Sequence, residues 1–169
     1  MDKHTDMYLE LVRTSGEKVA GESTDKENKD WIALQSFNIG MTQPVTMGSN
    51  TGNVTSGRVS VSHLSVTKTV DKSSPELALA CCNGETFKSL TLRIHEAAGK
   101  RHKYWEFLFE NVVISGYDPS CHGGETRFTE VVTFAFGKAK WTYHVLGNDG
   151  KPDKTIEHGW NLEENVQTC

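Results

Sequence analysis

The chain has 169 residues, of which 36% are hydrophobic and 24% are charged, and its formal net charge is −4. This length predicts a single domain over residues 1–169, and the apolar content excludes a disordered or fibrous chain. The acidic balance excludes a surface built to coat nucleic acid, and no stretch approaches the ~18 consecutive apolar residues of a membrane span. Residues 1–6 are polar, so we expect no secretory signal peptide and a cytoplasmic location after synthesis.

Alternation of apolar and polar residues predicts strands along most of the chain. The predicted strands cover residues 7–13, 31–41, 57–69, 87–96, 104–115, 127–136 and 138–145, with Gly137 as a break or bulge. About eight antiparallel strands in one chain of this length predict a β-barrel or β-sandwich. The expected fold class is therefore mainly β.

One short helix interrupts this pattern, over about residues 73–83. Ser73 and Glu76 have the spacing of a capping box, in which each side chain bonds to the other residue's backbone N–H. Gly84 follows, and it can adopt the left-handed conformation that ends a helix. We expect this helix to lie against the open side of the β structure.

Residues 42–57, here called the arm, contain no charged residue and are rich in Gly, Ser, Thr and Asn. A loop of this length is unusual inside a compact domain and is typically either functional or disordered. Two interpretations therefore stay open. The arm is a mobile surface loop, or it orders against a partner.

The second predicted strand also leaves two interpretations open. Its alternation places Trp31, Ala33 and Phe37 on one face and Ser36 and Asn38 on the other. Ser36 and Asn38 form either a polar binding surface or simply the hydrated side of a half-buried strand.

Catalytic and metal-binding motifs are absent from the sequence. The best candidate for reactivity is Cys121 beside His122, because a thiol near an imidazole can act as a nucleophile. No third group at a readable spacing orients the pair, and a plain Gly-rich turn is the preferred interpretation. We therefore expect a protein that is not an enzyme and that has no cofactor or metal.

Several segments, in order along nearly the whole chain, are similar to one known family. They are Gly21–Ser23, Gly40–Gln43, Leu64–Leu77 with Ala80 and Gly84, Leu90–Ile94, Tyr104–Ser115, Glu130–Phe134, Trp141–Tyr143 and Gly159–Leu162. This pattern resembles the haemolysin-coregulated protein (Hcp) family, the tube subunits of bacterial type VI secretion systems.

The resemblance implies a β-barrel-like subunit that forms a homo-hexameric ring. Rings stack into a tube inside a contractile sheath with a spike protein. Small effector proteins occupy the lumen, and the subunit itself is secreted. A related phage-tail-tube-like or adhesive binding module is the alternative.

The resemblance also assigns candidate contact residues. It implies that Ser36 and Asn38 face the lumen and contact cargo. The arm would supply contacts to the next ring or subunit, through Gln43, Pro44, Val45, Thr46, Met47, Asn50 and Val54.

Overall fold

The structure is a computed structural model that describes residues 5–48, 52–96 and 101–168. Predictions made above for Asn50 and for the first four residues lie outside this described part. The described residues form thirteen strands and one helix. The strands are β1 (Thr5–Arg13), β2 (Ile32–Leu34), β3 (Ser36–Asn38), β4 (Met41–Thr42), β5 (Val45–Met47), β6 (Val54–Ser56), β7 (Ser60–Val61), β8 (Leu64–Thr69), β9 (Thr86–Glu96), β10 (His102–Ser120), β11 (Thr129–Leu146), β12 (Pro152–Asn161) and β13 (Val166–Thr168), and the helix is α1 (Ser74–Asn83).

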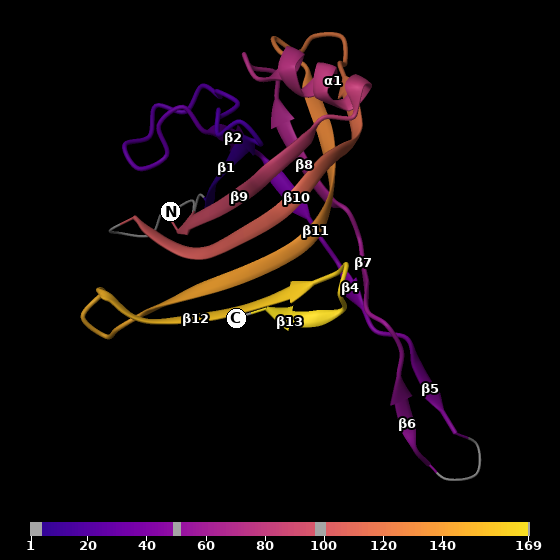
Figure 1. The fold of residues 1–169 in the computed structure, drawn as a ribbon. Coiled ribbons are helices and arrows are strands. Elements are labelled where there is room, and N and C mark those ends of the chain that lie inside the picture. The colour runs from indigo at the N-terminus through magenta and orange to yellow at the C-terminus, as the bar shows by residue number, and fades with distance from the viewer. Residues whose placement is uncertain (1–4, 49–51, 97–100, 169) are drawn as a thin grey trace.

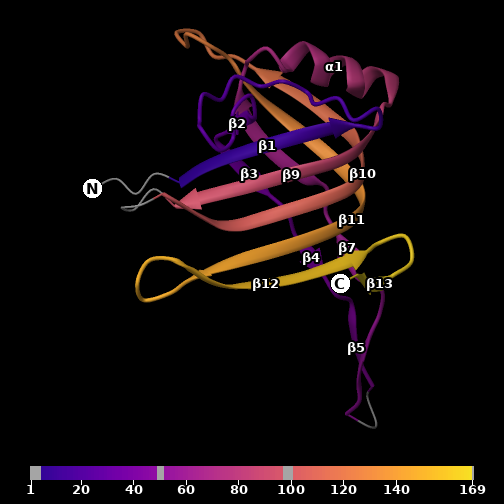
Figure 2. The ribbon, with the colours of Figure 1, turned by 60° about the vertical axis from the view of Figure 1, so that its left-hand side comes forward.

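Most of these strands belong to one strongly curled antiparallel sheet (Figures 1 and 2). Its order is β13-β12-β11-β10-β9-β1-β2, and β8 pairs with both β11 and β3. Because β2 and β3 follow each other in the chain, one short segment pairs with β1 at one end and with β8 at the other. The predicted class, a mainly β fold with one helix, is confirmed.

The core lies inside the curl and is filled by aliphatic and aromatic side chains. Leu11, Phe87 and Phe109 are completely buried. Phe109 lies between two further rings, with centroid distances of 5.7 Å to Phe107 and 4.5 Å to Phe136. Burial of apolar area on this scale is the main favourable contribution to folding.

Helix α1 lies across one end of the curled sheet (Figure 2). It ends as expected, with Gly84 in the left-handed conformation at φ 67°. The predicted capping box is wrong, because the Ser73 hydroxyl donates to Asp71 Oδ1 at 2.5 Å and does not cap the helix. Glu76 instead accepts a hydrogen bond of 2.7 Å from Arg13 on β1.

The predicted strand over residues 31–41 is divided, because the chain changes its pairing partner at Gln35. This change shifts the alternation by one residue. The residues on both sides of Ala33 are buried while Ala33 is exposed, and the next inward side chain is Phe37. The prediction that Ala33 and Phe37 share a face is therefore wrong.

The break predicted at Gly137 is also wrong, since β11 is continuous. The pairing of β10 with β11 sets Gly137 opposite Asn111, which has a φ of 55°. Asn111 Nδ2 donates to Glu163 Oε1 at 2.6 Å, and that carboxylate occupies the space where a Cβ at position 137 would lie. The glycine therefore permits a close side-chain approach within an unbroken strand.

Candidate assembly and cargo surfaces

Small polar side chains gather on the outward face where β3, β8 and β11 run side by side, next to the partly exposed Val131 of β11. Ser36 and Asn38 are exposed on β3 and pair with Thr67 and Ser65 of β8. Ser65 pairs in turn with Thr133 of β11. We call these five residues the small-polar face, and none of them carries a charge.

The sequence analysis identified Ser36 and Asn38 but missed the β8 contribution to this face. The sequence did carry a signal for it: in residues 64–69 the hydroxyl residues alternate with Leu64, Val66 and Lys68, and the structure buries these three side chains. What the alternation alone does not reveal is that β3 and β8 are neighbours.

The outward face of β9, β10, β11 and β12 is built from paired charges. Arg93 Nε lies 2.6 Å from Glu106 Oε2, and Lys140 Nζ lies 3.2 Å from Glu157 Oε1. Burial acts to raise the pKa of Glu106, but hydrogen bonding to Arg93 and the charge of Lys103 outweigh it and hold that pKa below its usual value. The curled sheet thus has two chemically different outer faces.

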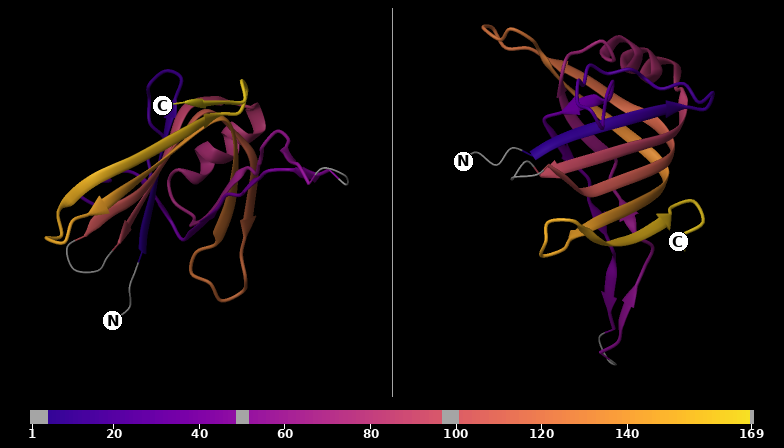
Figure 3. Two further views of the ribbon diagram at one scale, coloured as in Figure 1. Left: turned by 90° about the horizontal axis from the view of Figure 1, so that it is seen from below. Right: turned by 90° about the vertical axis from the view of Figure 1, so that its left-hand side faces the viewer.

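The arm, predicted as a loop, is instead a two-stranded ribbon that projects away from the curled sheet (Figures 1 and 3). β5 pairs with β6 so that Met47 lies opposite Val54 and Thr46 opposite Thr55. Because side chains alternate along a strand, Val45, Met47 and Val54 share one face and the two threonines share the other. The three apolar side chains are 57%, 78% and 60% exposed, in that order.

Hydrogen bonds hold the base of the arm to itself and to the main sheet. The Gly57 N–H donates to Pro44 O at 2.9 Å, and the Gln43 amide donates to Gly57 O. Arg58, the residue directly after the arm, donates from Nη2 to Leu162 O at 2.5 Å and so connects the end of the arm to the segment after β12. Gln43 and Pro44 thus organise the base of the arm, and the apolar face belongs to its outer part.

A shallow groove of about 250 Å³ lies beside the base of the arm. Trp141 and Trp160 contribute from β11 and β12, and Met41 and Val61 from β4 and β7. Sequence analysis did not identify this groove, because its walls come from segments about 100 residues apart.

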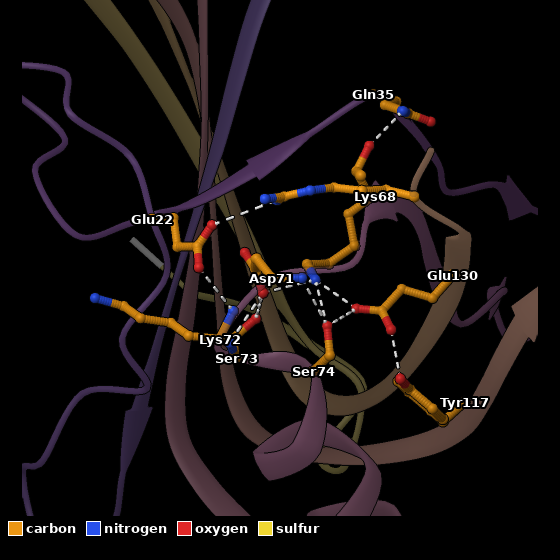
Figure 4. A network of polar contacts seen from close by, with 11 residues as sticks. Glu22, Gln35, Lys68, Asp71, Lys72, Ser73, Ser74, Tyr117 and Glu130 are labelled. Carbon is orange, nitrogen blue, oxygen red and sulfur yellow. Dashed lines mark hydrogen bonds and ion pairs between the residues drawn. The ribbon is translucent and has the colours of Figure 1, made fainter. Parts of the chain in front are cut away.

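A buried polar network joins the start of α1 to the sheet (Figure 4). The side chain of Lys68 is 1% exposed and that of Glu130 is fully buried. Lys68 Nζ donates to Glu130, to Asp71 Oδ1 at 2.9 Å and to Ser74 Oγ at 3.2 Å, which uses all of its N–H groups. Ser74 Oγ donates to Glu130 at 2.6 Å, and Tyr117 donates to the other oxygen of the same carboxylate.

The network fixes four separate parts of the chain to one another. Lys68 comes from β8, Ser74 from the first turn of α1, Tyr117 from β10 and Glu130 from β11. Burial, together with the bond to Glu130, raises the pKa of Tyr117 well above its usual value, so its hydroxyl stays a donor. This is structural chemistry, since every buried charge has a partner of opposite sign.

The candidate nucleophile has no catalytic arrangement. Cys121 is exposed, and its thiol lies 3.8 Å from the backbone carbonyl of His122. The backbone N–H of His122 lies 3.3 Å from Glu125 Oε2, within a turn. The geometry is that of the Gly-rich turn considered above.

Among residues 5–48, 52–96 and 101–168, no group of three or more His, Cys, Asp or Glu side chains is arranged to hold a metal ion. Within the same ranges, no helix is both long and apolar enough to cross a membrane.

Comparisons with known proteins agree on one family. The family model described as "Type VI secretion system effector, Hcp" matches residues 8–143. The chain is 36% identical over 112 residues to Protein hcp1 of Pseudomonas aeruginosa, which covers 65% of this chain and 69% of that protein. It is 29% identical over 145 residues to the Major exported protein of the same organism, covering 81% and 83% of the two chains.

Solved structures show the same relationship. A structure described as that of a type six secretion system protein superposes with a TM-score of 0.89 at 34% identity, covering 98% of this chain and 100% of the other. The family match spans well over half of the chain and includes both the small-polar face and the buried network. The chain therefore belongs to the Hcp family of type VI secretion system proteins.

Proposed function

We propose that this chain is a structural subunit of the inner tube of a type VI secretion system. It forms homo-hexameric rings that stack within the sheath, below the spike protein, and that carry small effector proteins. It starts in the cytoplasm and is exported with its cargo. The relative named Major exported protein supports the export step.

The observation that carries this proposal is the exposed apolar face of the arm. An isolated two-stranded hairpin is marginally stable in water, and exposed apolar side chains add nothing to its stability. Val45, Met47 and Val54 gain free energy only when a partner covers them. A repeating assembly supplies that partner to every copy, which favours the interaction arm over the mobile loop.

The small-polar face suits the proposed lumen. Ser36, Asn38, Ser65 and Thr67 offer hydroxyl and amide groups without charge, so they can contact many cargo surfaces without a strong preference for any. The charged face of β9 to β12 would bind charged cargo far more selectively. We therefore assign cargo contact to the small-polar face.

The assembly is tested by the native mass of the purified protein, measured by light scattering after size exclusion over a concentration series. A species close to six times 18.8 kDa is the expected result. A monomer that persists at high concentration would contradict the ring and favour the adhesive binding module.

Cargo contact is tested with Asn38→Arg, which places a long cation on the small-polar face. We expect the ring mass to stay unchanged while a co-expressed effector protein is no longer retained. Val166→Arg, at a valine that is 45% exposed on β13, is the matched control. Equal retention by both variants would remove Asn38 from the cargo surface.

A further inference from the structure

The loop of residues 14–31 connects β1 to β2 (Figure 1), and a buried histidine of β9 contacts it. Asn28 of this loop is completely buried, and its Nδ2 lies 3.0 Å from Nε2 of His95, whose side chain is 1% exposed. The ring of Tyr8 on β1 packs edge-on against His95 at a centroid distance of 5.9 Å. The other ring nitrogen of His95, Nδ1, has no hydrogen-bond partner among the described residues, and Glu27 Oε2 lies 4.0 Å from it.

The neighbours of Asn28 fix the orientation of its side-chain amide. Asn28 Nδ2 donates to Asp25 Oδ1 at 2.8 Å, and Asn28 Oδ1 accepts from Arg93 Nη1 at 3.3 Å. A carboxylate only accepts and a guanidinium only donates, so the amide nitrogen has to face Asp25 and the amide oxygen has to face Arg93. The same nitrogen contacts His95, so His95 Nε2 has to be the acceptor. The ring is therefore neutral, with its proton on Nδ1.

A proton on His95 Nε2 would set two N–H groups against each other. Rotation of the Asn28 amide gives no relief, because it would turn the amide oxygen toward the Asp25 carboxylate and the amide nitrogen toward the Arg93 guanidinium. The contact is therefore compatible with the neutral ring alone.

The charges around His95 do not compensate for burying a protonated ring. Glu27 on the loop and Asp6 on β1 favour the charged form, whereas Arg93 on β9 and Lys103 on β10 oppose it. Burial is the largest effect, and it lowers the pKa of His95 below the usual value of 6.5.

The other contacts of the loop limit how far it can open. At its end, Trp31 is 8% exposed, and the Arg93 guanidinium lies over its ring at 4.4 Å. In its middle, the Asp25 carboxylate binds Arg101, whose side chain is 31% exposed. Ion pairs this close to solvent contribute little stability. The loss of the buried Asn28 contact therefore frees residues 24–30 while Trp31 stays packed.

We propose that residues 24–30 form an acid-sensitive latch, which the neutral His95 holds against the sheet and which a proton on His95 releases. The release uncovers His95 and the adjacent ring of Tyr8. The latch goes beyond the proposed function and does not depend on it, because all of its groups belong to one chain.

The direction of the pH effect follows from linkage. In the released state His95 is in water, with its usual pKa of about 6.5, and in the closed state its pKa is lower. The closed state is therefore fully favoured above about pH 6.5 and loses stability as the pH falls toward the pKa of the closed state. Between pH 7.5 and pH 5.5, linkage through one such group raises the released population by at most about tenfold.

Hydrogen exchange of the full-length protein, read by mass spectrometry, measures this release once the rates are corrected for the intrinsic rate at each pH. In the unmodified protein, we expect the protection of residues 24–30 to fall by about threefold to tenfold from pH 7.5 to pH 5.5, while β10 and β11 keep theirs. His95→Gln keeps an acceptor for Asn28 but does not titrate, so its protection should be equal at both pH values. Asn28→Ala should already lower the protection of residues 24–30 at pH 7.5.

The matched control is His158→Gln, at an exposed histidine on β12, and it should behave as the unmodified protein does. Equal protection of residues 24–30 at both pH values in the unmodified protein would overturn the latch, and this comparison needs no variant. A loss at pH 5.5 that persists in His95→Gln would also overturn it, because another group would then be the sensor. A loss spread evenly over β10 and β11 would show general acid unfolding in place of a latch. These results leave the native mass, which tests the ring, as an independent measurement.

Discussion

Replacing the buried lysine of the polar network tests how α1 is held to the sheet. Lys68→Met removes the cation while Glu130 stays fully buried and Asp71 stays nearly so. An unpaired buried charge of this kind costs about 3–5 kcal/mol, a large part of the roughly 5–15 kcal/mol that stabilises a typical domain. In urea unfolding, this corresponds to a midpoint lower by roughly 2 M for a protein of this size.

Combining Lys68→Met with a second substitution shows whether the lost stability comes from an unpaired charge or from a lost packing contact. Glu130→Gln added to Lys68→Met removes the more deeply buried of the two unpaired carboxylates and keeps acceptor and donor groups for Ser74 and Tyr117. We expect it to recover at least half of the lost stability, because replacing both members of a buried pair is often close to neutral.

The assay is urea unfolding followed by circular dichroism, at one fixed protein concentration because assembly itself adds stability. Lys88→Met, at an exposed lysine on β9, is the control and should stay within about 0.5 kcal/mol of the unmodified protein. A loss below about 1 kcal/mol for Lys68→Met, or a double variant no more stable than the single one, refutes this account of the network.

Three further substitutions, two of them with a matched control variant, test other parts of the fold. Burial lowers the pKa of His95 in the folded protein. The contribution of the neutral His95 side chain to stability is therefore complete above about pH 6.5, and it is lost as the pH falls toward the folded pKa. His95→Gln should reduce this loss of stability in unfolding curves measured from pH 7 to pH 5. Gly21→Ala forces a Cβ against a backbone carbonyl and should cost about 1–3 kcal/mol by urea unfolding, whereas Gly123→Ala, with open space around it, should be nearly neutral. Leu77→Ala empties the buried contact of α1 and should cost about 2–5 kcal/mol in the same assay, while Leu79→Ala, at a side chain 63% exposed, should change stability little.

Local pattern was sufficient for the fold class and for several individual features. The alternation in residues 64–69 places every second side chain inward, and the structure agrees. Pro75 and Gly84 mark the start and the end of α1. Proline restricts the backbone to a helical φ and glycine can adopt the left-handed conformation, and neither property depends on distant residues. Ser36 and Asn38 are exposed as their alternation predicted.

Pairing between distant segments decided the features that the local sequence pattern did not predict. Lys68 falls on the inward face of its strand by alternation, but its partner Glu130 lies 62 residues away, and no local rule connects them. The phase shift at Gln35 arises because the chain leaves β1 for β8 at that point. Gly137 predicts a break in the strand, but in the structure its missing Cβ leaves room for the carboxylate of Glu163.

The arm and the groove beside its base show the same division between what the sequence determined and what the tertiary structure decided. The sequence by itself determined that the arm is uncharged and long, which follows from composition. Only the tertiary structure decided that the arm is a hairpin with one apolar face, because that depends on the register that sets Met47 opposite Val54. The groove exists only in three dimensions, since the folding of β11 and β12 beside β4 and β7 brings its walls together.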